Sequence, residues 1–157
     1  MDALARGRRY DRRVALIMLD LDGFKSVNDV HGHSVGDDLL CHLAHRAATL
    51  TRETDAICRL GGDEFIVLVD DVGDEKHVVQ HAERLLAALM CPIEVEGAPI
   101  QVGASVGVAI QPDAGDDAKA LMRSADQAMY AAKSAGGAGV RCQSLERAGP
   151  VDEHASL

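Results

Sequence analysis

The stretch at residues 59–65, which is Arg-Leu-Gly-Gly-Asp-Glu-Phe, constrains the fold more than any other part of the chain. Apolar runs flank it at residues 56–58 and 65–69. Two short apolar runs separated by a Gly-Gly turn are typical of a β-hairpin. Its glycines would let a ligand approach the backbone beside two adjacent carboxylates, Asp63 and Glu64. On these residues alone, the stretch is either a plain turn with solvated acids or part of a site.

A second constraint is the continuous apolar run at residues 14–19, which predicts a central strand buried on both faces. The run ends at Asp20 and Asp22, and ligands gather at the carboxyl ends of strands in α/β sheets. If this strand neighbours the hairpin, three or four carboxylates converge with Asp63 and Glu64. Carboxylates packed this closely repel unless they are protonated or bridged by cations. Oxygen ligands of this kind suit Mg²⁺ completed by phosphate and water, and the alternative is two unrelated turns.

The rest of the pattern predicts alternating helices and strands. We expect a polar segment over 23–36, helices over 37–50, 74–90 and 117–133, strands over 93–96 and 100–110, and an edge strand over 140–142. This βαββαβ order with an added hairpin indicates an α/β (α+β) fold, with a mixed, mainly antiparallel central sheet of about five strands flanked by helices. We interpret residues 1–13 as the remnant of an N-terminal helix, 14–142 as the domain and 143–157 as a polar C-terminal tail.

Composition narrows the classes of function. The 157 residues, with 47% apolar and 3% aromatic residues, suit one domain with an aliphatic core. A net charge of −9 argues against non-specific binding to nucleic acid or an anionic membrane. No apolar run approaches the roughly 20 residues of a membrane span. The four cysteines form no Cys-x-x-Cys pair, so they indicate reduced thiols and a cytoplasmic setting.

Several spaced motifs identify a family. They are Asp-Leu-Asp-Gly-Phe-Lys-Ser-Val-Asn-Asp at 20–29, Gly-His-Ser-Val-Gly-Asp at 32–37, the stretch at 59–65, Ala-Ser-Val-Gly-Val-Ala at 104–109 and Ala-Asp-Gln-Ala-Met-Tyr-Ala-Ala-Lys at 125–133. In this order they resemble the GGDEF family of diguanylate cyclases, over residues 12–142. The resemblance implies a fold similar to nucleotide cyclases and polymerase palms. It also implies condensation of two GTP molecules into cyclic di-GMP and pyrophosphate, across a transient homodimer.

The resemblance also assigns roles to individual residues. The Mg²⁺ (or Mn²⁺) ligands would be Asp20, the backbone carbonyl of Leu21, Asp63 and Glu64, and the catalytic residues Glu64, Asp63 and Asp20. The GTP site would comprise Phe24, Lys25, Asn28, Asp37, Gly62 and Lys133, with Asn28 and Asp37 reading guanine. Asp22 would give structural support rather than ligate the metal. Arg52 and Asp55 match the family's RxxD site, at which cyclic di-GMP acts as product inhibitor.

Three departures from the family's pattern bear on activity. Gly137 stands where family members usually carry an arginine, so we expect one phosphate contact to be missing. The usual DxLTGLxNR opening segment is absent, and so is a sensory or coiled-coil segment that would hold two domains together. We therefore expect a weak dimer, and a parent protein of the sensory or GGDEF-EAL type.

Two other functions stay open on the sequence alone. The chain could be a weak or inactive module that binds GTP or cyclic di-GMP and regulates a fused EAL-type partner. It could also be a cyclase or palm domain acting on another base, which fits the acids but not Asn28 with Asp37. Two helical pairs, His42 with His45 and His77 with His81, could bind a transition metal, but with no third ligand in view we interpret them as surface or partly buried histidines.

Overall fold

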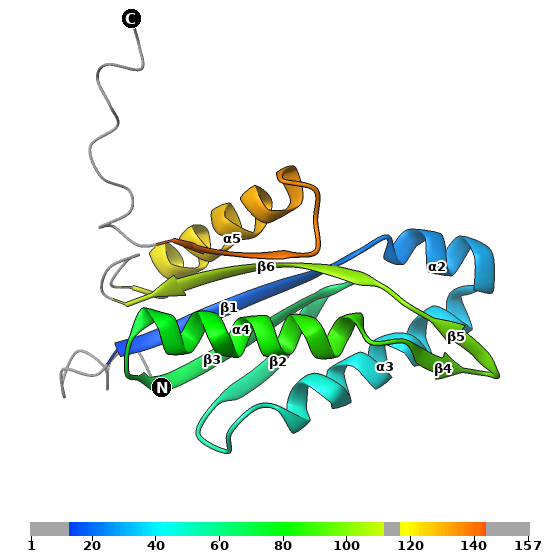
Figure 1. Ribbon diagram of the computed structural model, residues 1–157, viewed down its shortest axis with the longest axis horizontal. Coiled ribbons are helices and arrows are strands. Elements are labelled where there is room, and N and C mark those ends of the chain that lie inside the picture. Colours follow the sequence, from blue (N-terminus) through cyan, green and yellow to red (C-terminus); the bar gives the residue numbers. More distant parts are fainter. Residues whose placement is uncertain (1–12, 112–116, 144–157) are drawn as a thin grey trace, which may run out of the picture.

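The computed structural model describes residues 13–111 and 117–143. In chain order the elements are β1 (Arg13–Asp22), α2 (Phe24–His31), α3 (His33–Thr49), β2 (Ala56–Gly61), β3 (Glu64–Val72), α4 (Glu75–Met90), β4 (Ile93–Val95), β5 (Ala98–Ile100), β6 (Gly103–Ile110), α5 (Ala118–Ser134) and β7 (Gly139–Gln143) (Figure 1). The predicted N-terminal remnant and C-terminal tail lie outside the described residues, except for Arg13 and Gln143 at the ends of β1 and β7.

One five-stranded sheet forms the centre of the domain, in the order β2-β3-β1-β6-β7. All neighbouring strands in it are antiparallel except β6 and β7, which are parallel. The predicted mixed, mainly antiparallel sheet is therefore confirmed. The short strands β4 and β5 pair only with each other, at the end of the domain that also carries α2 (Figure 1).

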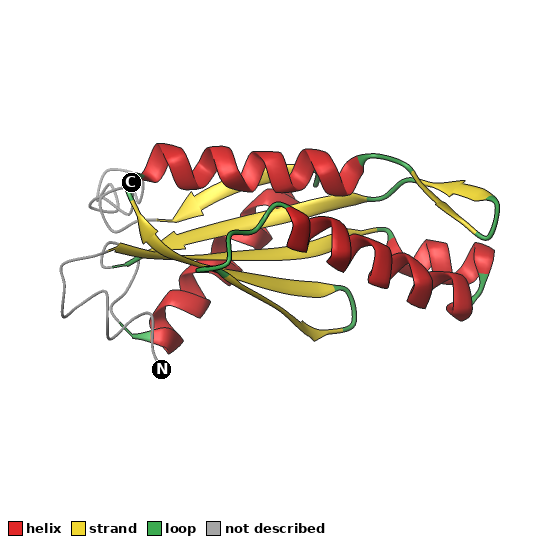
Figure 2. Cartoon of the chain, turned by 90° about the horizontal axis from the view of Figure 1, so that it is seen from below, coloured by secondary structure: helices red, strands yellow, loops and turns green. Residues whose placement is uncertain are grey.

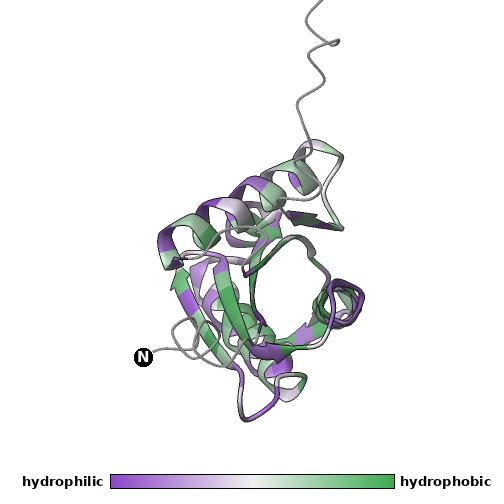
Figure 3. Ribbon diagram, turned by 90° about the vertical axis from the view of Figure 1, so that its left-hand side faces the viewer, coloured by the Kyte–Doolittle hydropathy of each residue, from purple (hydrophilic) through white to green (hydrophobic). Residues whose placement is uncertain are grey.

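Strand β1 is the middle strand, and its side chains are buried on both faces of the sheet. Val14, Leu16 and Met18 pack with Leu121, Ala125 and Met129 of α5. The alternate residues Ala15, Ile17 and Leu19 belong to the larger core, which includes Leu39 and Leu43 of α3 and Leu85 of α4. Figure 2 shows helices on both sides of the strands, and in Figure 3 the strands are largely green, the hydrophobic colour. The continuous apolar run thus forms a strand that is covered on both faces, as predicted.

The caps of two helices lie where the sequence predicts them. The Asp74 carboxylate accepts a hydrogen bond from the His77 amide at the start of α4, and Asp117 accepts one from the Ala120 amide at the start of α5. Arg46 of α3 donates to the carbonyls of Ala88 and Cys91, each at 2.8 Å, and so ties α3 to the end of α4. Among the described residues, none of the helices combines the length and apolar character of a membrane span.

The segment over residues 23–36 is largely exposed, as its polar character suggests, but it is helical where the sequence indicated no helix. This segment forms α2 and the first turn of α3, separated only by Gly32. Gly23 and Gly32 take positive φ angles of 75° and 92°, which start and end the short helix. Val27 is the one residue of α2 that is buried, and a helix of eight residues is too short for its apolar spacing to stand out in the sequence.

The predicted strand over residues 100–110 is divided in two. Glu96 and Gly97 take φ angles of 50° and 80°, as the two central residues of a type I′ turn do. They join β4 to β5, which ends at Ile100, and β6 begins only at Gly103. The turn lies one residue earlier than the predicted Gly-Ala-Pro, and Pro99 pairs with Glu94 in a two-stranded hairpin.

The contact between β6 and α5 depends on Gly107. A Cβ there would lie 2.1 Å from the Ala125 carbonyl oxygen and 2.4 Å from the Met129 amide nitrogen. We expect Gly107→Ala to lower the free energy of unfolding by about 2 kcal/mol, because the backbone atoms of α5 that the new methyl group would contact cannot move without shifting the helix. Gly73→Ala is the control, since the nearest atom to its Cβ is 3.8 Å away. Equal stability of the two variants by chemical denaturation would contradict this packing.

Candidate active site

The end of β1 and the tip of the β2–β3 hairpin meet, as predicted. In the sheet Asp20 lies opposite Glu64 of β3 on one side and Ser105 of β6 on the other. The Leu21 amide donates to the Asp63 carbonyl at 3.2 Å, which joins the hairpin tip to β1. Directly opposed residues of antiparallel strands point to the same face, so Asp20 and Glu64 share a face of the sheet.

Two interactions shape the hairpin tip itself. Arg59 Nε donates to the Gly62 carbonyl at 2.8 Å, across the turn formed by Gly62 and Asp63. Gly61 and Gly62 take φ angles of 145° and 53°, and a Cβ at either would meet no atom within 4 Å. The tip is therefore a glycine-shaped surface open to a ligand, with the Asp63 carboxylate beside it.

Asp20 is the buried charge of the site. It is 7% exposed, and its Oδ2 accepts a hydrogen bond from Lys133 Nζ of α5. Its Oδ1 is buried and has no hydrogen-bond partner among the described residues. Burial raises the pKa of the Asp20 carboxyl, the bond from Lys133 lowers it, and the nearby Asp63 charge raises it. The pKa of Lys133 is raised in turn, chiefly by its hydrogen bond to Asp20.

Asp22 has a structural position instead. Its carboxylate accepts hydrogen bonds from Ser105 Oγ and from the Ala138 amide, both at 2.9 Å. Gly137 lies directly behind it, because a Cβ there would be 2.7 Å from Asp22 Oδ2, and its φ is +76°. Asp22 thus fastens the turn after α5 to the central sheet.

The prediction that three or four carboxylates converge on one small volume is wrong. Within residues 13–111 and 117–143, no group of three or more His, Cys, Asp or Glu side chains is placed to hold a metal ion. The reason is that the Asp22 carboxylate accepts hydrogen bonds from Ser105 and the Ala138 amide, while one oxygen of Asp20 accepts a hydrogen bond from Lys133. The acids that do lie together are Asp20 and Asp63.

The residues present nevertheless fit a Mg²⁺ ion that carries substrate oxygens. Mg²⁺ is commonly held by one or two carboxylates, with phosphate oxygens and water completing its shell. Asp20 supplies a buried oxygen that lacks a partner, and Asp63 supplies a second carboxylate next to it. An unpaired buried carboxylate oxygen is costly, so a cation at this position would remove a cost already present in the fold.

A second unpaired oxygen lies between α2 and α3. Asn28 Oδ1 is buried without a hydrogen-bond partner among the described residues. A Cβ on Gly36 would lie only 1.8 Å from this oxygen and 3.3 Å from Cζ of Phe24. Gly36 therefore allows the close approach of the two helices, and the exposed Asp37 follows it directly. Asn28 thus lies against Gly36, the residue that precedes Asp37, and Lys25 is exposed on α2.

The predicted inhibitory residues form a compact pair. Asp55, whose side chain is 1% exposed, accepts bonds from Arg52 Nε and Nη2, both at 3.3 Å, and from the Asp70 amide at 3.2 Å. Arg52 Nη2 also donates to the Asp70 carbonyl at 2.8 Å. Asp55 thus links its loop to β3, while the Arg52 side chain remains 57% exposed.

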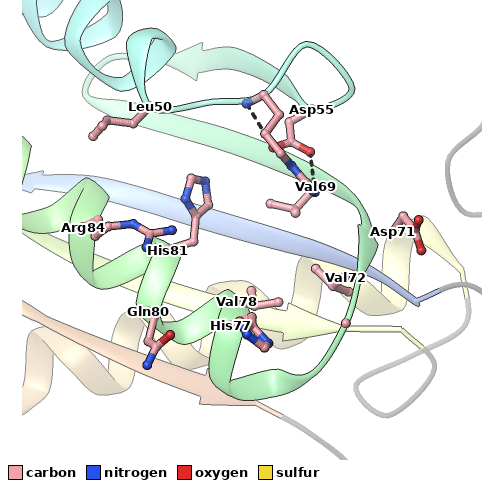
Figure 4. Close-up of a pocket in the computed structure, with 12 residues that line it drawn as sticks. Leu50, Asp55, Val69, Asp71, Val72, His77, Val78, Gln80, His81 and Arg84 are labelled. Atoms are coloured by element: carbon pink, nitrogen blue, oxygen red, sulfur yellow. Dashed lines mark hydrogen bonds and ion pairs between the residues drawn. The ribbon is translucent and has the colours of Figure 1, made fainter.

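Arg52 and Asp55 line a cavity of about 330 Å³. Figure 4 shows that its labelled side chains come from the end of α3, from the loop after it, from β3 and from α4. His81 and Arg84 complete the lining from α4. His81 is partly buried, within the expected range, and its Nε2 is buried without a hydrogen-bond partner among the described residues.

Sequence reasoning missed two supporting residues. Ser105 is fully buried in an apolar strand, and Gly36 is enclosed by Asn28 and Phe24. A lone serine within the apolar run of β6 is the signal that could have revealed the first. Nothing in the sequence near Gly36 indicates that it faces Asn28, because the contact depends on how α2 and α3 pack.

Comparisons with known proteins agree with the fold. The family described as "Diguanylate cyclase, GGDEF domain" matches residues 1–138, and the chain belongs to this family. The solved GGDEF domain of TpbB from Pseudomonas aeruginosa has a TM-score of 0.88 and 33% identity, covering 91% of this chain and 89% of that one. The domain therefore has the GGDEF fold.

Curated relatives of the chain are named both as cyclases and as phosphodiesterases. MucR of P. aeruginosa, a bifunctional diguanylate cyclase/cyclic di-GMP phosphodiesterase, is 40% identical over 134 residues, which are 85% of this chain and 19% of MucR. PdeR of Escherichia coli, a cyclic di-GMP phosphodiesterase, is 37% identical over 84% of this chain and 20% of PdeR. The chain thus spans about a fifth of these relatives.

The buried position of His81 predicts a pH effect on stability. Burial, followed by the charge of Arg84, lowers the pKa of His81 below its ordinary 6.5. As pH falls through 6.5, His81 takes up a proton in the unfolded chain before the folded one, so unfolding becomes more favourable. We expect His81→Gln to reduce the loss of unfolding free energy between about pH 7.5 and 5. The exposed His42→Gln is the control, and identical slopes for both variants and the parent would contradict the prediction.

Proposed function

We propose that the chain is the catalytic domain of a diguanylate cyclase that condenses two GTP into cyclic di-GMP and two pyrophosphates. The observation that carries the proposal is the buried, half-paired Asp20 carboxylate beside Asp63 at the glycine-shaped hairpin tip. In the reaction, the 3′-hydroxyl of each GTP attacks the α-phosphate of the other and pyrophosphate leaves. Two copies of the domain, each holding one GTP, would meet face to face for this double attack.

The metal ligands in this proposal are Asp20, Asp63, the Leu21 carbonyl and Glu64. Mg²⁺ or Mn²⁺ bound there would stabilise the charge that develops on the transferred phosphate. Glu64 lies opposite Asp20 in the sheet, and it would assist the metal site and accept the proton of the attacking hydroxyl.

The base and the phosphates would be held by α2, α3 and α5. The Asn28 oxygen and the Asp37 carboxylate are both hydrogen-bond acceptors, and the guanine edge offers N–H donors at two neighbouring positions. At those positions adenine has the acceptor N1 and a C–H group, so this pair of acceptors favours GTP over ATP. The phosphates would be contacted by Lys25, Lys133, the Phe24 backbone and Gly62. The two lysines would provide the positive charge that a protein of net charge −9 otherwise lacks.

The setting of the domain follows from its relatives. MucR contains a region similar to this chain within a protein about five times longer, so we place the chain in a cytoplasmic part of a larger sensory or GGDEF-EAL protein. Other segments of such a protein would bring two domains together, and the isolated domain would dimerise only transiently. Its activity would then rise steeply with concentration.

A second candidate function is a regulatory module that binds GTP or cyclic di-GMP without turnover. Gly137 favours it, because the arginine usual at that position in the family would add a phosphate contact. Gly137 has a φ of +76°, and a Cβ there would lie 2.7 Å from Asp22 Oδ2. An arginine at this position would therefore have to shift the Asp22 carboxylate. The similarity to PdeR, which is named as a phosphodiesterase, also agrees with a module of this kind.

Product inhibition is part of the proposal. Arg52, Asp55 and the adjoining cavity would hold cyclic di-GMP, with the exposed Arg52 guanidinium gripping a phosphate and guanine. The Asp55 carboxylate holds Arg52 in position through both of its oxygens, and it would bind a guanine edge once the exposed Arg52 guanidinium turns from it to the ligand. The cavity is lined by residues separate from those around Asp20, so inhibition would act without occupying the active site.

Turnover of GTP with Mg²⁺ across protein concentration tests the catalytic role. We expect cyclic di-GMP to form with a rate per domain that rises with concentration, and Glu64→Gln to reduce this rate at least about 100-fold. Glu94→Gln on β4, an exposed site, makes the same chemical change as a control. No product at high concentration, together with tight nucleotide binding by calorimetry, would favour the regulatory module instead.

Removal of Arg52 tests the inhibitory site. We expect Arg52→Ala to raise the cyclic di-GMP concentration needed for half inhibition by at least about tenfold, because a charged hydrogen bond to phosphate is lost. Arg123→Ala, at an exposed position of α5, is the control for loss of a surface arginine. Unchanged sensitivity of a folded Arg52→Ala protein would exclude this location for the inhibitor.

A further inference from the structure

The contact between Lys133 and Asp20 has a consequence for how metal and substrate bind. Lys133 stands in the last turn of α5, and its ammonium occupies Oδ2 of Asp20. This is the carboxylate that the proposed function assigns to the metal. The Lys133 side chain is 37% exposed, whereas that of Asp20 is 11% exposed, so the ammonium can leave and the carboxylate cannot.

We propose that Lys133 is a resident counterion of Asp20 that a divalent cation must displace, so that the metal and the substrate phosphates bind as a coupled pair. The inference rests on the proposed function. It adds that Lys133 has two successive partners: the Asp20 carboxylate in the empty domain and a substrate phosphate in the loaded one.

The charges around Asp20 explain why displacement is needed. A buried carboxylate requires a compensating charge, and in the empty domain Lys133 provides it for Asp20. A divalent cation that used the free Oδ1 would stand beside this ammonium at the same carboxylate, where two positive charges repel. The nearby Asp63 favours either cation, and a divalent cation gains the larger attraction because it carries two positive charges.

The released ammonium has space to move into. Lys133 and Asp20 line a cavity of about 420 Å³ together with Asp126, Gln127, Met129 and Tyr130 of α5. Because Met129 is 4% exposed and anchors α5 in the core, the helix can stay in place while the Lys133 side chain turns. A phosphate at the edge of this cavity would offer the ammonium a new anionic partner within reach of its flexible stem.

Thermodynamic coupling follows from this exchange. Metal alone must break the ion pair without offering Lys133 a new partner, so it binds weakly. A nucleotide supplies that partner, so each ligand strengthens the other by the same factor. The site would then remain free of divalent cations until substrate arrives.

The test measures Mn²⁺ binding to the whole chain without nucleotide, by the loss of the free-ion electron paramagnetic resonance signal. We expect Lys133→Met to bind Mn²⁺ at least about tenfold more tightly than the parent, because the competing ammonium is gone. Lys119→Met, at an exposed position in the first turn of α5, is the control and should match the parent. Equal affinity of Lys133→Met and the parent would overturn the inference.

Thermal unfolding provides a second readout. Without metal, Lys133→Met should unfold at a lower temperature than the parent, and added Mn²⁺ should raise its unfolding temperature more than that of the parent. Lys133→Gln repeats both measurements, which covers poor folding of the methionine variant. If the parent and both variants bind no Mn²⁺ and match Asp20→Asn, the proposed metal site itself is wrong. Binding that depends on Asp20 but not on Lys133 overturns only the counterion role.

Discussion

The pairing of β1 with β3 on one side and β6 on the other is the constraint on which the rest of the structure depends. It buries the whole apolar run of β1 between two layers of helices, and it fixes where the strand ends. Asp20 continues the alternation of Val14, Leu16 and Met18, so its side chain lies on the α5 face of the sheet. An acid there is enclosed by the same packing that makes the strand stable.

This enclosure accounts for the electrostatics of the site. A carboxylate on a residue that is only 7% exposed would be costly alone, and the ion pair with Lys133 offsets part of that cost. Asp63 raises the cost again, because it brings a second negative charge to the same place. The fold therefore holds a negatively charged site ready for a cation, and the stability of the domain and the proposed metal chemistry depend on the same residues.

The central elements were predictable from the sequence because their signals are local. The apolar run of β1, the Gly-Gly turn of the hairpin, and the capping acids Asp74 and Asp117 each depend on neighbouring residues. Helix α2 was not predictable in this way, since it spans only eight residues between two glycines and buries only Val27. The break between β5 and β6 at Gln101 and Val102 was missed because neither residue is a turn former, and the pairing of β5 with β4 instead of the main sheet decides it.

By itself the sequence determined the family, the mainly antiparallel sheet and the meeting of Asp20 with the Asp63 hairpin tip, because motif spacing and hydrophobic period carry that information. Only the tertiary structure decided which acids share the site. Asp22 is held by Ser105 and the Ala138 amide, and Asp20 by Lys133, 113 residues further along the chain. Such partners are set by the packing of α5 and β6 on β1, and a side chain's charge partner cannot be read from its neighbours in sequence.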